Sequence, residues 1–198
     1  PTPTPAPAPT PEPTPAPEPE PIPSPIVYKG TGDDVIKIEK PGGVKACIVF
    51  IQGNAEGRHF AVKGLDTNRN STGLLVNTTD SYEGIVGLDF KGEVTTYLEI
   101  SATGRWHIEL RHVRTARAIQ APGTITGNSD DVILVKGDGD TVFIEGNKRG
   151  RHFAVRAYGD RTKLLVNTTD PYKGTVLLPS GTFLVEVSAV GEWVITFE

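Results

Sequence analysis

The chain has 198 residues, of which 22% are charged and 37% hydrophobic, and its formal net charge is −4. This balance offers neither the basic field that nucleic-acid binding requires nor a polybasic patch for a membrane surface. No apolar run reaches the roughly 20 residues of a membrane-spanning helix. Because the sequence begins with proline, contains no methionine and shows no signal peptide, we expect a mature or trimmed form of a secreted or cell-surface protein.

Residues 1–25 have proline at every odd position. Each proline restricts its own φ and keeps the preceding residue out of the helical region, which predicts an extended, polyproline-like arm. We favour a spacer, and the alternative is an arm that takes part in assembly. In that alternative, the apolar residues that end the arm would form a strand that pairs with a neighbouring subunit; they are Ile22, Ile26, Val27 and Tyr28.

An internal repeat organises the rest of the chain and predicts one module at 26–113 and a second at 118–198. The spacing between matched motifs shortens along the chain, which indicates shorter loops in the second copy. The matched segments are Asp33–Ile36 with Asp130–Ile133, Gly57–Val62 with Gly150–Val155, Leu74–Asp80 with Leu164–Asp170, Tyr82 and Gly84 with Tyr172 and Gly174, and Ser101, Ala102 and Trp106 with Ser188, Ala189 and Trp193.

Short strands separated by turn residues make up each copy. At the end of the first copy, Trp106, Ile108 and Leu110 alternate with polar residues, which is typical of a sheet with one buried face. We therefore predict an all-β fold with two tandem antiparallel β-sandwiches of Greek-key or jelly-roll type, and a small closed barrel is the alternative. The strands expected in the second copy are 131–136, 141–146, 152–157, 163–167, 174–178, 182–188 and 192–197.

At these motifs the chain resembles a module that recurs in secreted and cell-surface proteins of bacteria and some archaea. The resemblance implies an appended binding or spacer unit, often beside a Pro/Thr-rich linker, and it implies no particular activity. The motifs are Gly32–Asp34, Phe60 with Val62, Leu74–Asn77, Tyr82 with Gly84, and Ala102, Gly104 and Trp106, and their counterparts in the second copy, where Ser129 replaces the first glycine.

Two kinds of residue are expected in the core. Trp106 and Trp193 are interpreted as core anchors, and the alternative is an exposed platform that stacks on sugars. Cys47, the only cysteine, lies in an apolar run, so a buried small side chain is favoured over a reactive or intermolecular thiol.

Several polar residues are candidates for binding. Paired aspartates precede a strand in each copy and could ligate structural calcium, although aspartate is also an ordinary turn residue. An outward histidine after arginine, near the tyrosine of each copy, could contact a ligand. The metal candidates are Asp33, Asp34, Asp130 and Asp131, and the ligand candidates are Arg58, His59, Tyr82, Arg151, His152 and Tyr172.

Three sequons, at Asn70, Asn77 and Asn167, fit the N-glycosylation pattern, but we favour Asx-type turns for the Asn-Thr-Thr-Asp segments. No catalytic motif is present, so we expect no enzyme and no cofactor apart from the calcium option. The leading expectation is an extracellular structural or adhesive protein that self-associates, as a fibre subunit if the arm assembles. The alternative is a tandem module of a larger secreted protein that binds carbohydrate, a glycan or a cell-wall polymer.

Overall fold

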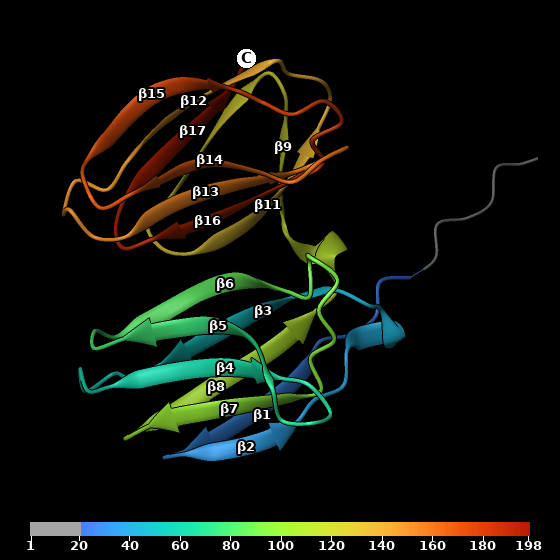
Figure 1. The fold of residues 1–198 in the computed structure, drawn as a ribbon, viewed down its shortest axis with the longest axis vertical. Coiled ribbons are helices and arrows are strands. Elements are labelled where there is room, and N and C mark those ends of the chain that lie inside the picture. Colours follow the sequence, from blue (N-terminus) through green and yellow to red (C-terminus); the bar gives the residue numbers. More distant parts are fainter. Residues whose placement is uncertain (1–20) are drawn as a thin grey trace, which may run out of the picture.

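The computed structural model describes residues 21–198, and nearly all of its regular structure is β-strand, so the predicted all-β fold is confirmed (Figure 1). Residues 1–20 of the expected proline arm lie outside the described residues. Among the described residues, no helix has the length and apolar character needed to cross a membrane.

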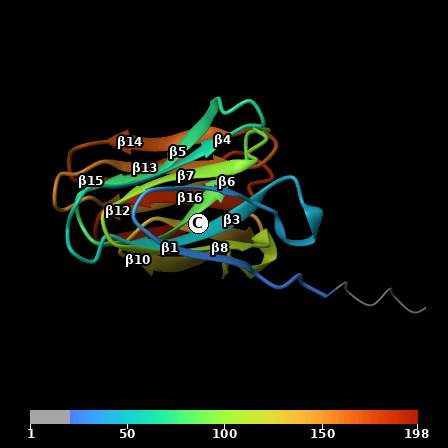
Figure 2. The ribbon, with the colours of Figure 1, turned by 90° about the horizontal axis from the view of Figure 1, so that it is seen from below.

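Two consecutive β-sandwiches account for all the strands (Figures 1 and 2). We call the first module 1. Its elements are β1 (Ile26–Thr31), β2 (Asp34–Lys37), η1 (Pro41–Gly43), β3 (Cys47–Gly53), β4 (Phe60–Leu65), β5 (Ser71–Thr78), β6 (Tyr82–Leu88), β7 (Tyr97–Ala102) and β8 (Arg105–Arg111).

The second sandwich, module 2, begins after a short 3-10 turn. Its elements are η2 (Val113–Thr115), β9 (Arg117–Gln120), β10 (Gly123–Gly127), β11 (Asp131–Lys136), β12 (Thr141–Gly146), β13 (Phe153–Tyr158), β14 (Lys163–Thr168), β15 (Tyr172–Leu177), β16 (Leu184–Ala189) and β17 (Trp193–Phe197).

The two modules share one strand order. Module 1 consists of sheet A (β1-β8-β3-β6) and sheet B (β2-β7-β4-β5), and module 2 of sheet D (β10-β17-β12-β15) and sheet C (β14-β13-β16-β11-β9). Every pairing is antiparallel except that of β9, which runs parallel to β11 and extends sheet C. Strands β9 and β10 were not predicted from the sequence. Their sequences, RAIQ and GTITG, are too short and too sparsely apolar to show a strand period.

A tryptophan anchors the core of each sandwich, as predicted. Trp106 is 3% and Trp193 is 1% exposed. Each indole Nε1 donates a hydrogen bond to a backbone carbonyl, of Gly32 at 3.0 Å and of Ser129 at 2.8 Å. Because these rings are buried within the sandwiches, they provide no exposed platform for a sugar. The only cysteine, Cys47, is fully buried, so its interpretation as a small core residue is confirmed.

The two modules are packed directly against each other. Strand β6, at the edge of sheet A, lies beside the outer face of sheet C at β11 and β16 (Figure 1). A small apolar cluster closes this contact, in which the rings of Phe90 and Tyr158 meet edge to face at 5.4 Å between centroids. The cluster also contains the fully buried side chains of Ile48 and Val132. Buried apolar contact of this kind holds the modules in one relative orientation.

The N-terminal apolar segment has a partner within its own chain. Ile26, Val27 and Tyr28 belong to β1, which pairs with β8 of module 1, whereas Ile22 precedes the strand and is 48% exposed. This segment therefore pairs with β8 of its own module, whereas the assembly alternative expected it to pair with a neighbouring subunit.

Candidate functional site: the inter-module groove

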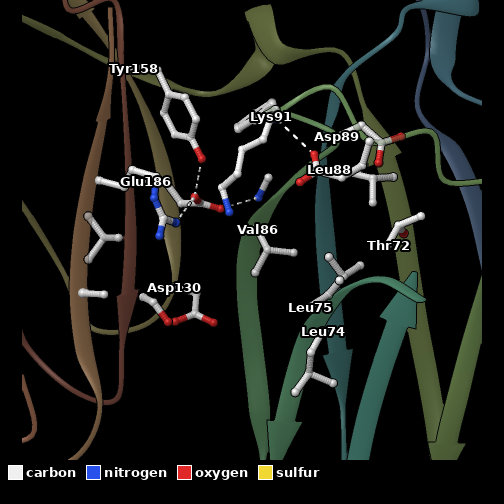
Figure 3. Close-up of a pocket in the computed structure, with 18 of the residues that line it drawn as sticks. Thr72, Leu74, Leu75, Val86, Leu88, Asp89, Lys91, Asp130, Tyr158 and Glu186 are labelled. Carbon is white, nitrogen blue, oxygen red and sulfur yellow. Dashed lines mark hydrogen bonds and ion pairs between the residues drawn. The ribbon is translucent and has the colours of Figure 1, made fainter. Parts of the chain in front are cut away.

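A groove runs between the modules beside the β6 contact. Its larger section has a volume of about 1190 Å³ and its smaller section about 400 Å³. The two sections share lining residues from both modules, among them Leu74 of β5 and Ser188 of β16, so they form one continuous groove. Figure 3 shows the smaller section, with Glu186 and Tyr158 of module 2 facing Leu74 and Val86 of module 1.

The wall that module 1 contributes is an edge strand. The residues from Thr72 to Thr78 of β5 all line the groove in consecutive order. Because successive side chains of a strand point to opposite faces, a strand that lines a groove with consecutive residues presents its edge to it. Leu74 projects there with 60% of its surface exposed.

The base of the groove is held together by hydrogen bonds between the modules. The hydroxyl of Tyr82 donates to Oδ2 of Asp130 at 2.6 Å, and the amide of Ile85 donates to the Asp130 carbonyl at 3.0 Å. The hydroxyl of Ser129 donates to the carbonyl of Glu83. These bonds run from β6 to the two residues that precede β11, so both modules build the floor of the groove.

Burial shifts the pKa of this hydrogen-bonded pair. It raises the pKa of the Asp130 carboxyl above its ordinary value, although the hydrogen bonds from Tyr82 and from the amide of Ala189 oppose the shift. The pKa of Tyr82 is also raised, first by burial and then by the neighbouring Asp130 charge. The tyrosine therefore stays protonated and acts as a hydrogen-bond donor.

A second polar cluster lies on the sheet C side of the smaller section. Glu186 accepts hydrogen bonds from the hydroxyl of Tyr158 at 2.8 Å and from the amide of Gly87 at 3.1 Å. It also forms an ion pair with Arg156 at 3.5 Å. Burial and the Glu186 charge raise the pKa of Tyr158. Because Gly87 lies on β6, the Glu186 carboxylate also links sheet C to module 1 through a hydrogen bond.

Basic residues of the β12–β13 turn border the larger section. Arg151 forms an ion pair across the groove with Asp80 at 3.3 Å, and Lys148 lies 3.6 Å from Glu192. Within the described part of the chain, Arg149 has no ion-pair or hydrogen-bond partner. The turn is shaped by Asn147, whose φ is 61° and whose Oδ1 accepts from the amide of Arg151.

The structure brings together only half of the ligand candidates. Tyr82, Arg151 and His152 line the groove. Their partners in the repeat lie elsewhere, since Arg58 and His59 are exposed in the β3–β4 turn and Tyr172 packs against the module 2 core. The inter-module residues Leu74, Arg149 and Glu186 were not predicted. One signal could have revealed the wall that β5 contributes to the groove: its sequence is uncharged and contains a pair of leucines.

The paired aspartates have structural partners. Oδ1 of Asp33 accepts from the amide of Ala102 at 2.9 Å, and Oδ1 of Asp130 accepts from the amide of Ala189 at 2.7 Å. Asp34 and Asp131 each accept from the amide of the next residue, and Asp131 also pairs with Arg117. Among the described residues, no group of three or more histidine, cysteine or acidic side chains is placed to hold a metal ion.

The predicted Asx-type turns are replaced by threonine turns. Asn77 and Asn167 lie inside β5 and β14, and the hydroxyls of Thr78 and Thr168 accept from amides two residues later, each at 3.0 Å. An asparagine side chain can form an Asx-type turn, but here each asparagine lies within a strand that continues past it. Asn70 is exposed before β5, where its side chain donates to Asp66.

Comparisons with known proteins give only a distant likeness. No protein-family model and no curated protein matches the chain. Among solved structures, the regulatory subunit of a cAMP-independent protein kinase A from Trypanosoma brucei matches over 87% of this chain and 73% of that chain, at 10% identity and a TM-score of 0.26. The subunit from Trypanosoma cruzi, bound to guanosine, matches over 87% and 72%, at 9% identity and a TM-score of 0.27.

The regulatory domain of Toxoplasma gondii protein kinase A with cAMP matches over 87% of this chain and 78% of that chain, at 10% identity and a TM-score of 0.25. By these comparisons two expectations are wrong. An extracellular adhesive, fibre-forming or carbohydrate-binding protein was expected, and the similar structures are kinase regulatory subunits. No cofactor apart from calcium was expected, whereas two of those proteins hold cAMP or guanosine. Likeness at these TM-scores transfers no ligand to this chain.

Proposed function

We propose that this chain is a non-catalytic binding protein and that its ligand occupies the inter-module groove. The observation that carries the proposal is that both modules line one continuous groove while direct contacts hold them in place. A site whose walls are already positioned does not require the ligand to order the two modules, so less binding free energy is lost on association.

Binding is favoured over catalysis because the acidic groups at the base of the groove are engaged in structural bonds. Both oxygens of Asp130 accept hydrogen bonds, from Tyr82 and from Ala189. Glu186 accepts from Tyr158 and Gly87 and pairs with Arg156. A catalytic acid or base must instead be within hydrogen-bond reach of the group it protonates or deprotonates.

The size of the groove favours an elongated ligand. The larger section alone, about 1190 Å³, exceeds the range of roughly 300–1,000 Å³ that is typical of small-molecule pockets. The smaller section continues it along β5 towards Thr72. A ligand that filled both sections would therefore contact module 1 and module 2 over most of the length of β5.

The test is a ligand screen followed by a hydrogen-exchange footprint on the full chain. The screen includes extended peptides, oligosaccharides, and cAMP and guanosine, which are named for two of the similar structures. We expect a bound ligand to protect amides of β5 and of the turn that contains Arg149. Protection confined to another face would overturn the proposal, as would the absence of any ligand.

A matched pair of variants separates a groove effect from general damage. Ala154→Trp places a large side chain in the smaller section, where Ala154 lies on β13. Its repeat counterpart Ala61, on β4, lines neither section of the groove, so Ala61→Trp is the control. We expect Ala154→Trp to weaken binding at least about tenfold and Ala61→Trp to leave it unchanged. Equal losses in both variants would contradict the assignment.

A further inference from the structure

Strand β5 offers an unpaired edge to the groove. In sheet B the order is β2-β7-β4-β5, and β5 pairs only with β4. Within the part of the chain that the structure describes, no other strand pairs with it. Its outer row of backbone amides and carbonyls therefore faces the groove that residues Thr72 to Thr78 line. Such a row is the template on which an extended peptide adds as a further strand.

The sequence of β5 lacks the usual protection of an edge. Natural sheets guard their edges with charged residues, above all lysine, or with proline. Strand β5 reads STGLLVNT and contains neither. Its repeat counterpart β14 reads KLLVNT, and its Lys163 amine donates to the carbonyl of Leu177 at 2.9 Å. The position of Lys163 is taken in β5 by Gly73, so β5 lacks the edge lysine that its repeat counterpart carries.

Charged side chains of both signs line the groove. Arg151 pairs with Asp80 and Lys148 with Glu192, whereas Glu83 and Glu93 accept only from uncharged donors. Within the described residues, the side chains of Lys91 and Arg149 have no partner. Lys91 lines only the smaller section and Arg149 only the larger one. An occupant with an acidic group towards each end would therefore complement these two cations.

The groove is also continuous with an established contact. Strand β6, at the corresponding edge of sheet A, already packs against sheet C, and β5 is the edge strand of the other sheet of the same sandwich. A strand added to β5 would extend that contact along the outer face of sheet C. The exposed Leu74 and Leu164, which line the smaller section, would supply apolar contacts on either side.

Resting on the groove being the binding site, we propose that its ligand is an extended peptide segment of a partner protein, apolar in the middle and acidic towards both ends, which adds as a strand to β5. Backbone hydrogen bonds to the β5 edge would provide affinity. The leucines and the two unpaired cations would select the sequence.

The probe is a blocked ten-residue peptide of alternating valine and threonine with glutamate at both ends, titrated into the full chain by calorimetry. Two further peptides carry N-methyl groups on alternate amides, one in each register. Strand addition uses every second amide, so one methylated peptide should lose binding at least about tenfold while the other is tolerated. Equal tolerance of both registers, or no binding of the parent peptide, would overturn the proposal.

A protein variant tests the edge itself. A Cβ at Gly73 would meet no atom within 4 Å, so Gly73→Lys introduces, without a clash, the lysine that β14 has at this position. We expect it to weaken the peptide at least about tenfold. Gly104→Lys is the matched control, because Gly104 is equally unobstructed and lies outside the groove. An equal loss of binding in the control would contradict strand addition at the β5 edge. Circular dichroism and urea unfolding establish that both variants are folded.

The same measurements distinguish a failure of the peptide proposal from a failure of the groove proposal. If another ligand class binds with a footprint on β5 and is displaced by Ala154→Trp, the groove is the site and the peptide is the wrong occupant. If the parent peptide binds and Ala154→Trp and Gly73→Lys leave its affinity unchanged, both proposals fail. A chain that dimerises through β5 without binding the peptide also overturns the inference, because its partner is then a second copy.

Discussion

The hydroxyl of Tyr82 in module 1 donates a 2.6 Å hydrogen bond to the carboxylate of Asp130 in module 2. The same carboxylate accepts from the amide of Ala189 within its own module. The Asp130 side chain therefore bonds both to the end of β16 within module 2 and to β6 of module 1.

Removing the Tyr82 hydroxyl should loosen this contact. We expect Tyr82→Phe to lower the free energy of unfolding by about 1 to 3 kcal/mol, because a buried acceptor loses its donor. The ring contact with Phe60 is retained in this variant. Urea unfolding provides the measurement. The control is Tyr172→Phe, since no hydrogen bond involves the Tyr172 hydroxyl in the described part of the chain. Equal effects of the two substitutions would contradict a special role for Tyr82.

The raised pKa of Asp130 predicts a pH dependence. A carboxyl with a higher pKa in the folded state binds its proton more tightly there, so it stabilises the fold below its ordinary pKa. This contribution is lost as the pH rises through the raised value. Relative to Asp130→Asn, the native chain should therefore gain unfolding free energy on acidification from about pH 7 to about pH 4. Urea unfolding across this range is the test, and a difference that shrinks on acidification would refute the shift.

The tryptophan anchors require glycine opposite them. A Cβ on Gly127 would lie 2.2 Å from Cζ2 of Trp193, so Gly127→Ala should cost about 1 to 3 kcal/mol of stability through overpacking. Trp193→Phe removes the clashing atoms, so the double variant should lose less than the sum of the single losses. Thermal and urea unfolding measure this, with Gly104→Ala as the control. Simple additivity would show that the two residues do not conflict.

The Cys47 thiol should be unreactive in the folded chain. It is fully buried, and burial raises its pKa to about 12, so almost no thiolate is present at neutral pH. An aromatic disulfide reagent should label it only as fast as the chain unfolds and should label it at once in denaturant. Rapid labelling of the native chain would contradict the buried position.

The sequence was sufficient to predict most strands but not how the modules meet. Strands β11 and β12 have the predicted bounds, because alternation and turn residues delimit them locally. The contact between Tyr82 and Asp130 joins residues 48 positions apart, and no local period reports it. The groove depends on that contact, so its residues could not be assembled from motifs even though Tyr82 and Arg151 were singled out.

The same limit explains why Arg58, His59 and Tyr172 were expected to resemble their partners in the repeat. Self-similarity predicts that two copies fold alike, and they do. Self-similarity does not tell which copy contributes a strand edge to the inter-module contact and which contributes a sheet face.

The asymmetry between the two copies also shows at matched positions of β6 and β15. Gly87 on β6 approaches Phe90 and Glu186 so closely that a Cβ would lie 2.4 Å from the Phe90 ring. Its repeat counterpart on β15 is Leu177, which is 67% exposed. The two copies are therefore not exchangeable, because module 1 supplies an edge strand to the contact and module 2 supplies a sheet face. A chain with the modules in reversed order would contain every residue of this one and would lose its groove.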